Sequence, residues 1–197
     1  MEEIFKIVEC KFENKNISTN TIIPNIKIIN NSSKDSPAFT DPRYLPFYYR
    51  LGCEVAPKNV LQIGSNMGLI GACFLKGCNT VENWTCIDVN NFYTNITKSN
   101  LLKKYYLIFE NFFIENDINK INLNKKYDFS FLTENLDHIF HDCLTYLWDN
   151  TKSNGVIVVD YIFEKNIDKI FKNFCEIKNL NPFLFNTRYG TGVLIKR

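Results

Sequence analysis

The fold of this chain is decided by the stretch VLQIGSNMG, residues 60–68. Its mostly apolar beginning is typical of a buried strand, and apolar residues at helical spacing follow from Leu69. Gly64 permits a tight turn with positive φ, and Gly68 lets a backbone or a ligand approach closely. The N-terminus of the following helix offers free N–H groups and a positive partial charge. The stretch therefore predicts a strand, a turn and a helix, with a ligand site at the turn.

An acidic residue at the end of the next strand supports this site. Residues 83–89 form the second predicted strand, and Asp88 and Val89 end it about 20 residues beyond the glycines. A carboxylate there can accept both hydroxyl hydrogens of a ribose, as in Rossmann-type sheets. Nucleoside binding is thus predicted. The alternative is an ordinary strand–helix–strand unit in which these glycines and Asp88 serve only turns.

Strands and helices alternate over the rest of the chain. Near-continuous apolar strands between helices indicate a parallel sheet covered on both faces, which is an α/β three-layer sandwich. A closing hairpin is predicted around Tyr189 and Gly190. The predicted strands are 59–64, 83–89, 105–113, 127–134, 155–163, 182–188 and 191–197, and the predicted helices are 69–77, 91–104, 115–121, 136–150 and 164–179.

Two units divide the chain in this interpretation. Residues 1–42 are predicted as a small N-terminal β-hairpin extension followed by a polar loop, and residues 43–197 as the main domain. The main domain opens with a helix over 43–54, in which Tyr48 belongs to an aromatic and aliphatic stripe at three-to-four spacing. We expect this stripe to face the core. A lid over a substrate or cofactor is the alternative.

The amino-acid composition limits the classes of partner that this chain is expected to bind. The chain has 197 residues, 45% hydrophobic residues and a formal net charge of +2, so no whole-chain field attracts nucleic acid or an anionic membrane. Its seven cysteines form no CxxC pair, which favours buried thiols in a reducing compartment. No apolar run reaches the ~20 residues of a membrane span. We expect a cytoplasmic protein, or, for a virus-encoded chain, one in the host cytoplasm or the virion.

From residue 57 to about residue 195 the chain resembles the class I S-adenosylmethionine (SAM)-dependent methyltransferases. Their first motif runs acidic-x-Gly-x-Gly-x-Gly, which residues 62–68 match with Gln62 at the acidic position and Asn66 at the middle glycine, and Asp88 matches their ribose-binding acid. The resemblance implies a Rossmann-like, mostly parallel seven-stranded sheet with an antiparallel C-terminal hairpin. It also implies SAM as cofactor. The dehydrogenase spacing G-x-G-x-x-G is absent. The predicted cofactor-binding residues are Gly64, Ser65, Asn66, Gly68, Asp88 and Val89.

Candidate catalytic groups should lie at the C-terminal ends of the fourth and fifth strands. Glu134 and Asp160 stand there and are predicted to orient the methyl acceptor or take its proton. Capping of the next helix by a strand-end carboxylate is the alternative. The pattern also resembles small-molecule O-methyltransferases, in which a strand-four Asp and an Asp-Asn pair hold a divalent metal. Thr133 and Tyr161 replace two of those ligands, so no metal site is predicted. Glu134 follows Thr133 directly, and alternation along a strand would turn its side chain to the other face.

The predicted function is SAM-dependent methyl transfer to an oxygen or nitrogen atom of an acceptor. That acceptor is a small molecule or a macromolecular side chain, and the motifs of DNA base methyltransferases are absent. The alternative is a methyltransferase-fold protein without catalysis that serves as a binding or structural subunit, for example in a viral or phage assembly. Self-association into a homo-oligomer stays open, and the sequence carries no nucleic-acid or membrane signal.

Overall fold

The computed structural model describes residues 44–65, 68–102, 105–114, 117–134, 136, 138–187 and 189–197. The predicted N-terminal extension, residues 1–42, lies outside them. The helices are α3 (Tyr44–Glu54), α4 (Leu69–Gly77), α5 (Asn91–Leu102), α6 (Phe140–Asn150) and α7 (Lys165–Ile177), with a short 3-10 helix, η3 (Ile118–Lys120). The strands are β1 (Asn59–Ile63), β2 (Asn83–Asp88), β3 (Ile108–Phe113), β4 (Tyr127–Leu132), β5 (Thr151–Asp160), β6 (Phe183–Phe185) and β7 (Thr191–Ile195).

These strands form one sheet of seven in the order β3-β2-β1-β4-β5-β7-β6. The pairs from β3 to β5 are parallel, whereas β7 runs antiparallel to β5 and to β6. The predicted α/β fold, with its mostly parallel sheet and antiparallel C-terminal hairpin, is therefore confirmed. The order also places the carboxyl ends of β1 and β4 side by side, where the chain switches from one half of the sheet to the other. In open α/β sheets this switch point is where ligands bind.

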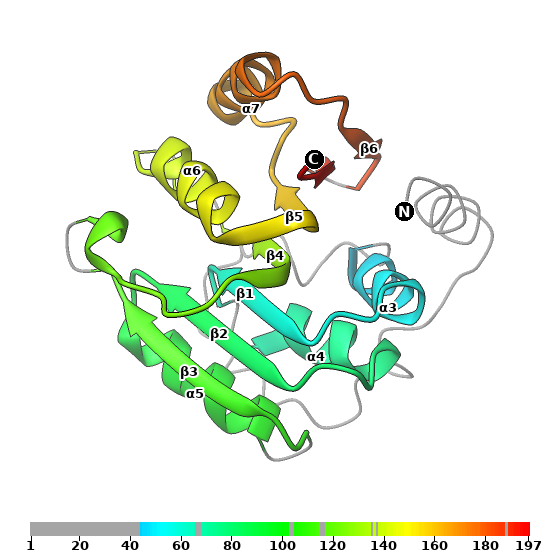
Figure 1. Cartoon of the computed structure of the whole chain (residues 1–197), viewed down its shortest axis with the longest axis vertical. Helices are drawn as coiled ribbons and strands as arrows, with labels where there is room; N and C mark the ends of the chain where they lie inside the picture. The colour runs from blue at the N-terminus through cyan, green and yellow to red at the C-terminus, as the bar shows by residue number, and fades with distance from the viewer. Residues whose placement is uncertain are drawn as a thin grey trace.

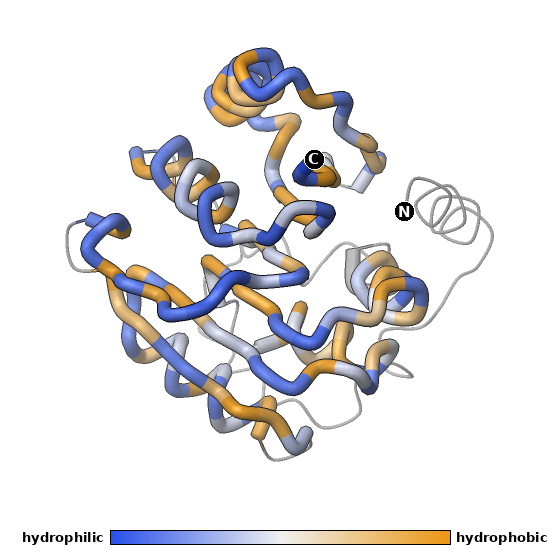
Figure 2. Tube along the Cα trace, in the orientation of Figure 1, coloured by the Kyte–Doolittle hydropathy of each residue, from blue (hydrophilic) through white to orange (hydrophobic). Residues whose placement is uncertain are grey.

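Helices cover both faces of the sheet (Figure 1). Alternate strand residues point to opposite faces, so that Val60 joins the core under α3, α4 and α5, and Leu61 joins the core under α6 and α7. The predicted core-facing stripe of α3 is confirmed for its described side chains, because Phe47, Tyr48 and Leu51 are fully buried. Figure 2 shows hydrophilic and hydrophobic residues mixed along α6 and α7, as expected of helices with one apolar face.

Most boundaries differ from the predicted ones by up to three residues, and the starts of two elements differ by four. Helix α6 begins at Phe140 rather than at residue 136, because a turn at His138 and Ile139 precedes it. Strand β5 begins at Thr151 rather than at residue 155, with a register shift against β4 between Tyr127 and Phe129. Its polar beginning resembles a turn in sequence but pairs with the start of β4. Within the described ranges, no helix combines the length and the apolar character needed to cross a bilayer.

Candidate functional site

The turn after β1 has the geometry that its glycines predict. Gly64 and Gly68 adopt φ angles of 83° and 82°, in the left-handed region that favours glycine. The Gly64 amide donates to the Ile87 carbonyl at 2.9 Å, and the Gly68 amide donates to the Ser65 carbonyl at 2.8 Å. A Cβ atom on Gly64 would lie 2.5 Å from the Cβ of Glu134. The turn thus lies directly against the chain that leaves β4. Asn66, the remaining predicted member of the turn, lies outside the described residues.

Asp88 points toward this turn and is 1% exposed. Its Oδ2 accepts hydrogen bonds from the Ser65 amide, at 2.8 Å, and from the Ser65 hydroxyl. Its Oδ1 accepts one from the Asn90 amide at 2.8 Å. These three donors fix the carboxylate between the turn and the start of α5, while a carboxylate offers about four lone-pair sites. Val89, the other predicted residue here, is half-buried and packs against the core under α6 and α7.

Gln62, at the acidic position of the motif, is fully buried on β1. Its Nε2 donates to the Gly64 carbonyl at 2.8 Å and to the Thr133 hydroxyl at 3.3 Å. The Thr133 hydroxyl in turn donates to the Gly64 carbonyl at 2.6 Å. The Oε1 of Gln62 is buried and has no hydrogen-bond partner. A buried acceptor without a donor is costly, so a donor from a ligand or from a water molecule would stabilise this oxygen.

Glu134 supplies a second acceptor of this kind. Strand β4 ends at Leu132, so the strict alternation of an extended strand no longer applies at Glu134, and its side chain packs beside Gly64. The Oε2 of Glu134 is buried without a hydrogen-bond partner. Burial, with a contribution from the negative charge of Asp88, raises the pKa of Glu134 from 4.5 to about 7. The carboxyl group can therefore gain and lose a proton near neutral pH.

Replacing Glu134 by Gln should remove a pH dependence of stability. Because folding raises this pKa, the folded state holds a proton that the unfolded chain loses, so the favourable contribution is complete below pH 4.5 and disappears as the pH rises through 7. Between pH 5 and pH 8 the free energy of unfolding of the wild-type protein should fall by about 2 kcal/mol. That of Glu134→Gln should not show this fall. Thermal unfolding at both pH values should show a relative gain for the variant of about 5 °C at pH 8. An equal difference at the two pH values would contradict the assignment.

Asp160, the other candidate carboxylate, is held in a buried hydrogen-bond network and is 2% exposed. The Tyr48 hydroxyl, from α3, donates to Oδ2 at 2.6 Å, and the Thr191 hydroxyl, from β7, donates to Oδ1 at 2.7 Å. The next residue, Tyr161, has a φ of 65°, and its ring stacks on Tyr189 with ring centroids 5.4 Å apart. Asp160 thus links α3 to the antiparallel hairpin.

Tyr48→Phe should destabilise the protein by about 2 kcal/mol, because it removes a hydroxyl donor from a buried carboxylate. Tyr146→Phe is a matched control, since the Tyr146 hydroxyl donates at 2.7 Å to the neutral carbonyl of Ile121. The control should lower the free energy of unfolding by about 1 kcal/mol. Urea unfolding of both variants measures the difference, and equal losses would show that the hydrogen bond to Asp160 is no stronger than the one to a neutral carbonyl.

The residues that replace metal ligands, Thr133 and Tyr161, offer hydroxyl groups rather than carboxylate or amide oxygens. The Thr133 hydroxyl donates its hydrogen to the Gly64 carbonyl. Asp160 accepts a hydroxyl hydrogen at each of its two oxygens. Burial raises the pKa of Tyr161 well above its usual value, so its phenol stays neutral. Hard divalent cations prefer several carboxylate or carbonyl oxygens, and this donor set does not fit them. Over the described part of the chain, no group of three or more His, Cys, Asp or Glu side chains is placed to hold a metal ion.

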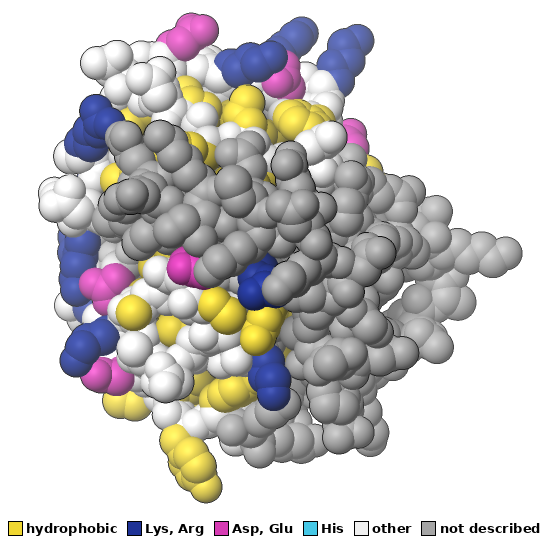
Figure 3. Space-filling view, turned by 90° about the vertical axis from the view of Figure 1, so that its right-hand side faces the viewer, with side chains coloured by type: hydrophobic (Ala, Val, Ile, Leu, Met, Phe, Trp, Pro, Cys, Tyr) yellow, Lys and Arg dark blue, Asp and Glu magenta, His cyan; other side chains and the backbone are white. Residues whose placement is uncertain are grey.

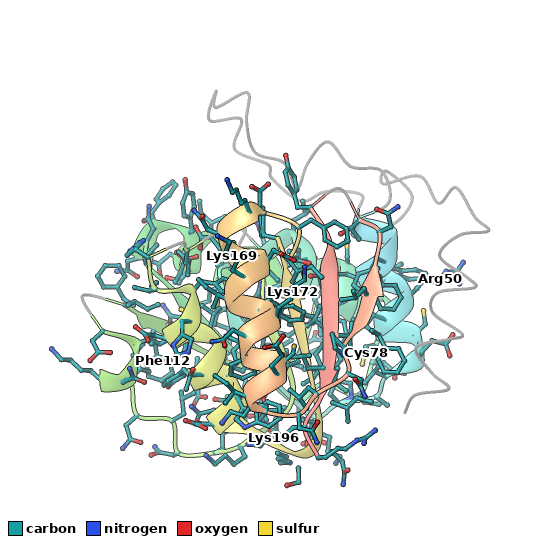
Figure 4. All side chains as sticks on the ribbon, turned by 90° about the horizontal axis from the view of Figure 1, so that it is seen from above. Arg50, Cys78, Phe112, Lys169, Lys172 and Lys196 are labelled. Atoms are coloured by element: carbon teal, nitrogen blue, oxygen red, sulfur yellow. The ribbon has the colours of Figure 1, made fainter. Side chains whose placement is uncertain are left out.

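A pocket of about 570 Å³ lies elsewhere, between α7 and β6. Phe163, Phe171 and Leu184 line it together with the Lys172 side chain, and none of the described residues of the glycine turn does. Figure 4 shows Lys169 and Lys172 on α7 near the middle of the view, with Arg50 at its right edge. On the face drawn in Figure 3, the Lys and Arg side chains of the described residues are dispersed and mixed with Asp and Glu.

The sequence thus located the glycine turn, Asp88 and Glu134, and the structure brings these together. It did not indicate the network around Asp160. Tyr48 was identifiable as a core residue of α3, but it lies 112 positions from its carboxylate partner. Nor did the sequence indicate the unpaired Oε1 of Gln62, because only the packed turn shows which of its two polar atoms finds a partner.

No protein-family model and no curated protein sequence matches this chain. Solved structures do match it. The methyltransferase PaMTH1 of Podospora anserina, bound to S-adenosylhomocysteine (SAH), gives a TM-score of 0.67 at 14% identity, over 100% of this chain and 96% of that one. The O-methyltransferase of Bacillus cereus in complex with SAH gives 0.62 at 12% identity, over 100% and 90%. The precorrin-6y C5,15-methyltransferase of Geobacter metallireducens gives 0.59 at 12% identity, over 80% and 90%. At such identities the likeness concerns the fold, and this chain has the Rossmann-like fold of the class I SAM-dependent methyltransferases.

Proposed function

We propose that this chain is a SAM-dependent methyltransferase that transfers a methyl group to an oxygen or nitrogen atom of its acceptor. The observation that carries the proposal is the left-handed turn at Gly64, held against the buried carboxylate of Asp88 at the switch point of the sheet. Two of the solved structures with this fold, from Podospora anserina and Bacillus cereus, contain SAH. Neighbours with the same fold act on different acceptors, so the fold does not select one.

The described residues fit SAM by their chemistry. SAM carries an ammonium group, a sulfonium cation and two ribose hydroxyls, so it brings hydrogen-bond donors and positive charge. The site offers acceptors in return: the partly used carboxylate of Asp88, and the unpaired buried oxygens of Gln62 and Glu134. In this proposal Asp88 holds the ribose through Oδ1, and the backbone at Gly64 and Gly68 lets the cofactor approach. Ser65 acts through Asp88, to which its amide and hydroxyl donate.

When bound, SAM supplies an activated methyl group for an in-line displacement, in which alignment provides much of the rate. The chain's own part is to hold the two reactants and to handle a proton where the acceptor must lose one. Glu134 suits the second task, because its pKa of about 7 lets it act as a base at neutral pH. Asp160 suits a role in orienting the acceptor, because the hydroxyl groups of Tyr48 and Thr191 donate hydrogen bonds to its two oxygens and hold it in place.

The rival function is a binding or structural subunit that keeps the fold without catalysis. Four departures from the resembled families favour it: Gln62 and Asn66 in the first motif, and Thr133 and Tyr161 at the metal-ligand positions. Calorimetric titration of the full chain with SAM and with SAH separates the two. The methyltransferase proposal predicts micromolar binding of both ligands. Absence of heat at high protein concentration would favour the structural subunit, and NAD binding in its place would indicate a dehydrogenase-like site.

A further inference from the structure

Glu134 is placed to respond to the charge of whatever binds at the turn. Its Cβ lies 2.5 Å from the position that a Cβ of Gly64 would occupy, so no side chain separates it from the backbone of the turn. Its Oε2 is buried and unpaired. Beside it on β1, fully buried Gln62 presents a second unpaired oxygen from a side chain that bonds to Gly64 and Thr133. These oxygens can be satisfied by donors or by positive charge, and while Glu134 is ionised neither can satisfy the other.

Among the described residues that face Glu134, Asp88 is the charged neighbour. Asp88 of β2 acts on it directly and raises its pKa. Cys86 of β2, Cys143 of α6 and Tyr161 after β5 also feel the charge of Glu134, but burial raises the pKa of each of these groups far above neutrality. They stay uncharged between pH 6 and pH 8. A ligand at the turn therefore meets one carboxylate or two, depending on the proton on Glu134.

We propose that Glu134 makes this site select its ligand by charge, favouring the sulfonium cofactor SAM over its uncharged thioether product SAH. This inference rests on the proposed function, since it assumes that both ligands bind at the turn. SAM and SAH differ by one methyl group and one positive charge, so contacts to the shared adenosine and amino acid parts cannot separate them. A buried carboxylate can, because Coulomb interactions are strong where water is excluded. The enzyme would then release its product more readily than its cofactor.

The selection should depend on pH. A cation bound near Glu134 favours its ionised form and lowers its pKa, so SAM binding releases a proton and strengthens as the pH rises through 7. A shift of one pKa unit corresponds to about a tenfold change in affinity. SAH brings no charge at the sulfur atom and should lack this gain.

Calorimetric titrations of the full wild-type chain with SAM and with SAH, at pH 6 and pH 8 and constant ionic strength, test the proposal. The preference for SAM over SAH should rise about five- to tenfold between the two pH values. Glu134→Gln should abolish that rise, and its preference at pH 8 should fall to the wild-type value at pH 6. Glu82→Gln is a matched control, because Glu82 is an exposed partner of Lys58 at the opposite end of the sheet. Ionisation of the ligands themselves cancels between variants.

Each outcome decides a different claim. If neither ligand binds the wild-type protein, the proposed function fails, and this inference fails with it. If both bind and the wild-type preference is the same at the two pH values, the charge selection is wrong while the proposed function stands. The same holds if Glu134→Gln keeps the rise. Should the variant fold poorly, a wild-type preference that is the same at the two pH values still contradicts the charge selection.

Discussion

Gly64→Ala is expected to destabilise this protein by about 4 kcal/mol and to abolish ligand binding at the turn. A side chain at a φ of 83° costs about 1–2 kcal/mol for an L-residue. The new Cβ would also lie 2.5 Å from the Cβ and 2.9 Å from the amide nitrogen of Glu134. One of these atoms belongs to the backbone, so relief requires the β1 turn and the chain after β4 to move apart. The loss approaches the whole stability of an ordinary domain.

Gly68→Ala is the matched control. Its φ of 82° brings the same conformational cost, but the nearest heavy atom, the Cα of Thr97, would be 3.3 Å from the new Cβ. We expect a loss of about 2 kcal/mol. Urea unfolding monitored by circular dichroism measures both variants. Equal losses would show that the contact between Gly64 and Glu134 does not hold the site together.

Asp88→Asn is expected to lower SAM affinity by at least about tenfold and the free energy of unfolding by about 2–3 kcal/mol. Asp88 accepts from the Ser65 amide, the Ser65 hydroxyl and the Asn90 amide. An asparagine has a single acceptor oxygen, so its NH₂ group would face one of these donors. The ribose hydroxyls would also lose a charged acceptor. Calorimetry with SAM and urea unfolding measure the two effects.

Asp128→Asn is a control that separates the loss of SAM affinity from the loss of stability. Asp128 also accepts backbone amide hydrogens, from Lys58 and Asn59, but it does so at the amino-terminal edge of the sheet. This control should lose stability and keep its SAM affinity. A variant Asp88→Asn that unfolds more easily and binds SAM as well as the wild-type protein would show that Asp88 serves only the turn.

The fold followed from the sequence because its decisive signals are local. The turn after β1 needs two residues with positive φ, and glycine is the residue that adopts them without cost. Apolar strands and amphipathic helices of similar length then gave the order of elements. The start of α6 was wrong by four positions, because Leu136 is buried by tertiary packing before the helix begins. The start of β5 was wrong because polar Thr151 pairs within the core, through the Ser130 hydroxyl.

The candidate site could be predicted from the sequence only where neighbouring strands bring their carboxyl ends together. Glu134 was predicted at this edge, but alternation argued against its direction, since the end of β4 at Leu132 could not be known. The burial of Glu134 and its raised pKa depend on packing against Gly64 and on the distant Asp88. The partners of Asp160 come from α3 and β7, and no spacing rule connects segments so far apart in the chain.

A crystal structure of the full chain with SAH tests the account most directly. We expect the adenosyl group to lie over the backbone at Gly64, with a ribose hydroxyl donating to Oδ1 of Asp88, the sulfur atom near Oε2 of Glu134 and the ammonium group near the unpaired oxygen of Gln62. A ligand found in another place, or an Asp88 that touches only Ser65 and Asn90 at saturating SAH, would contradict it.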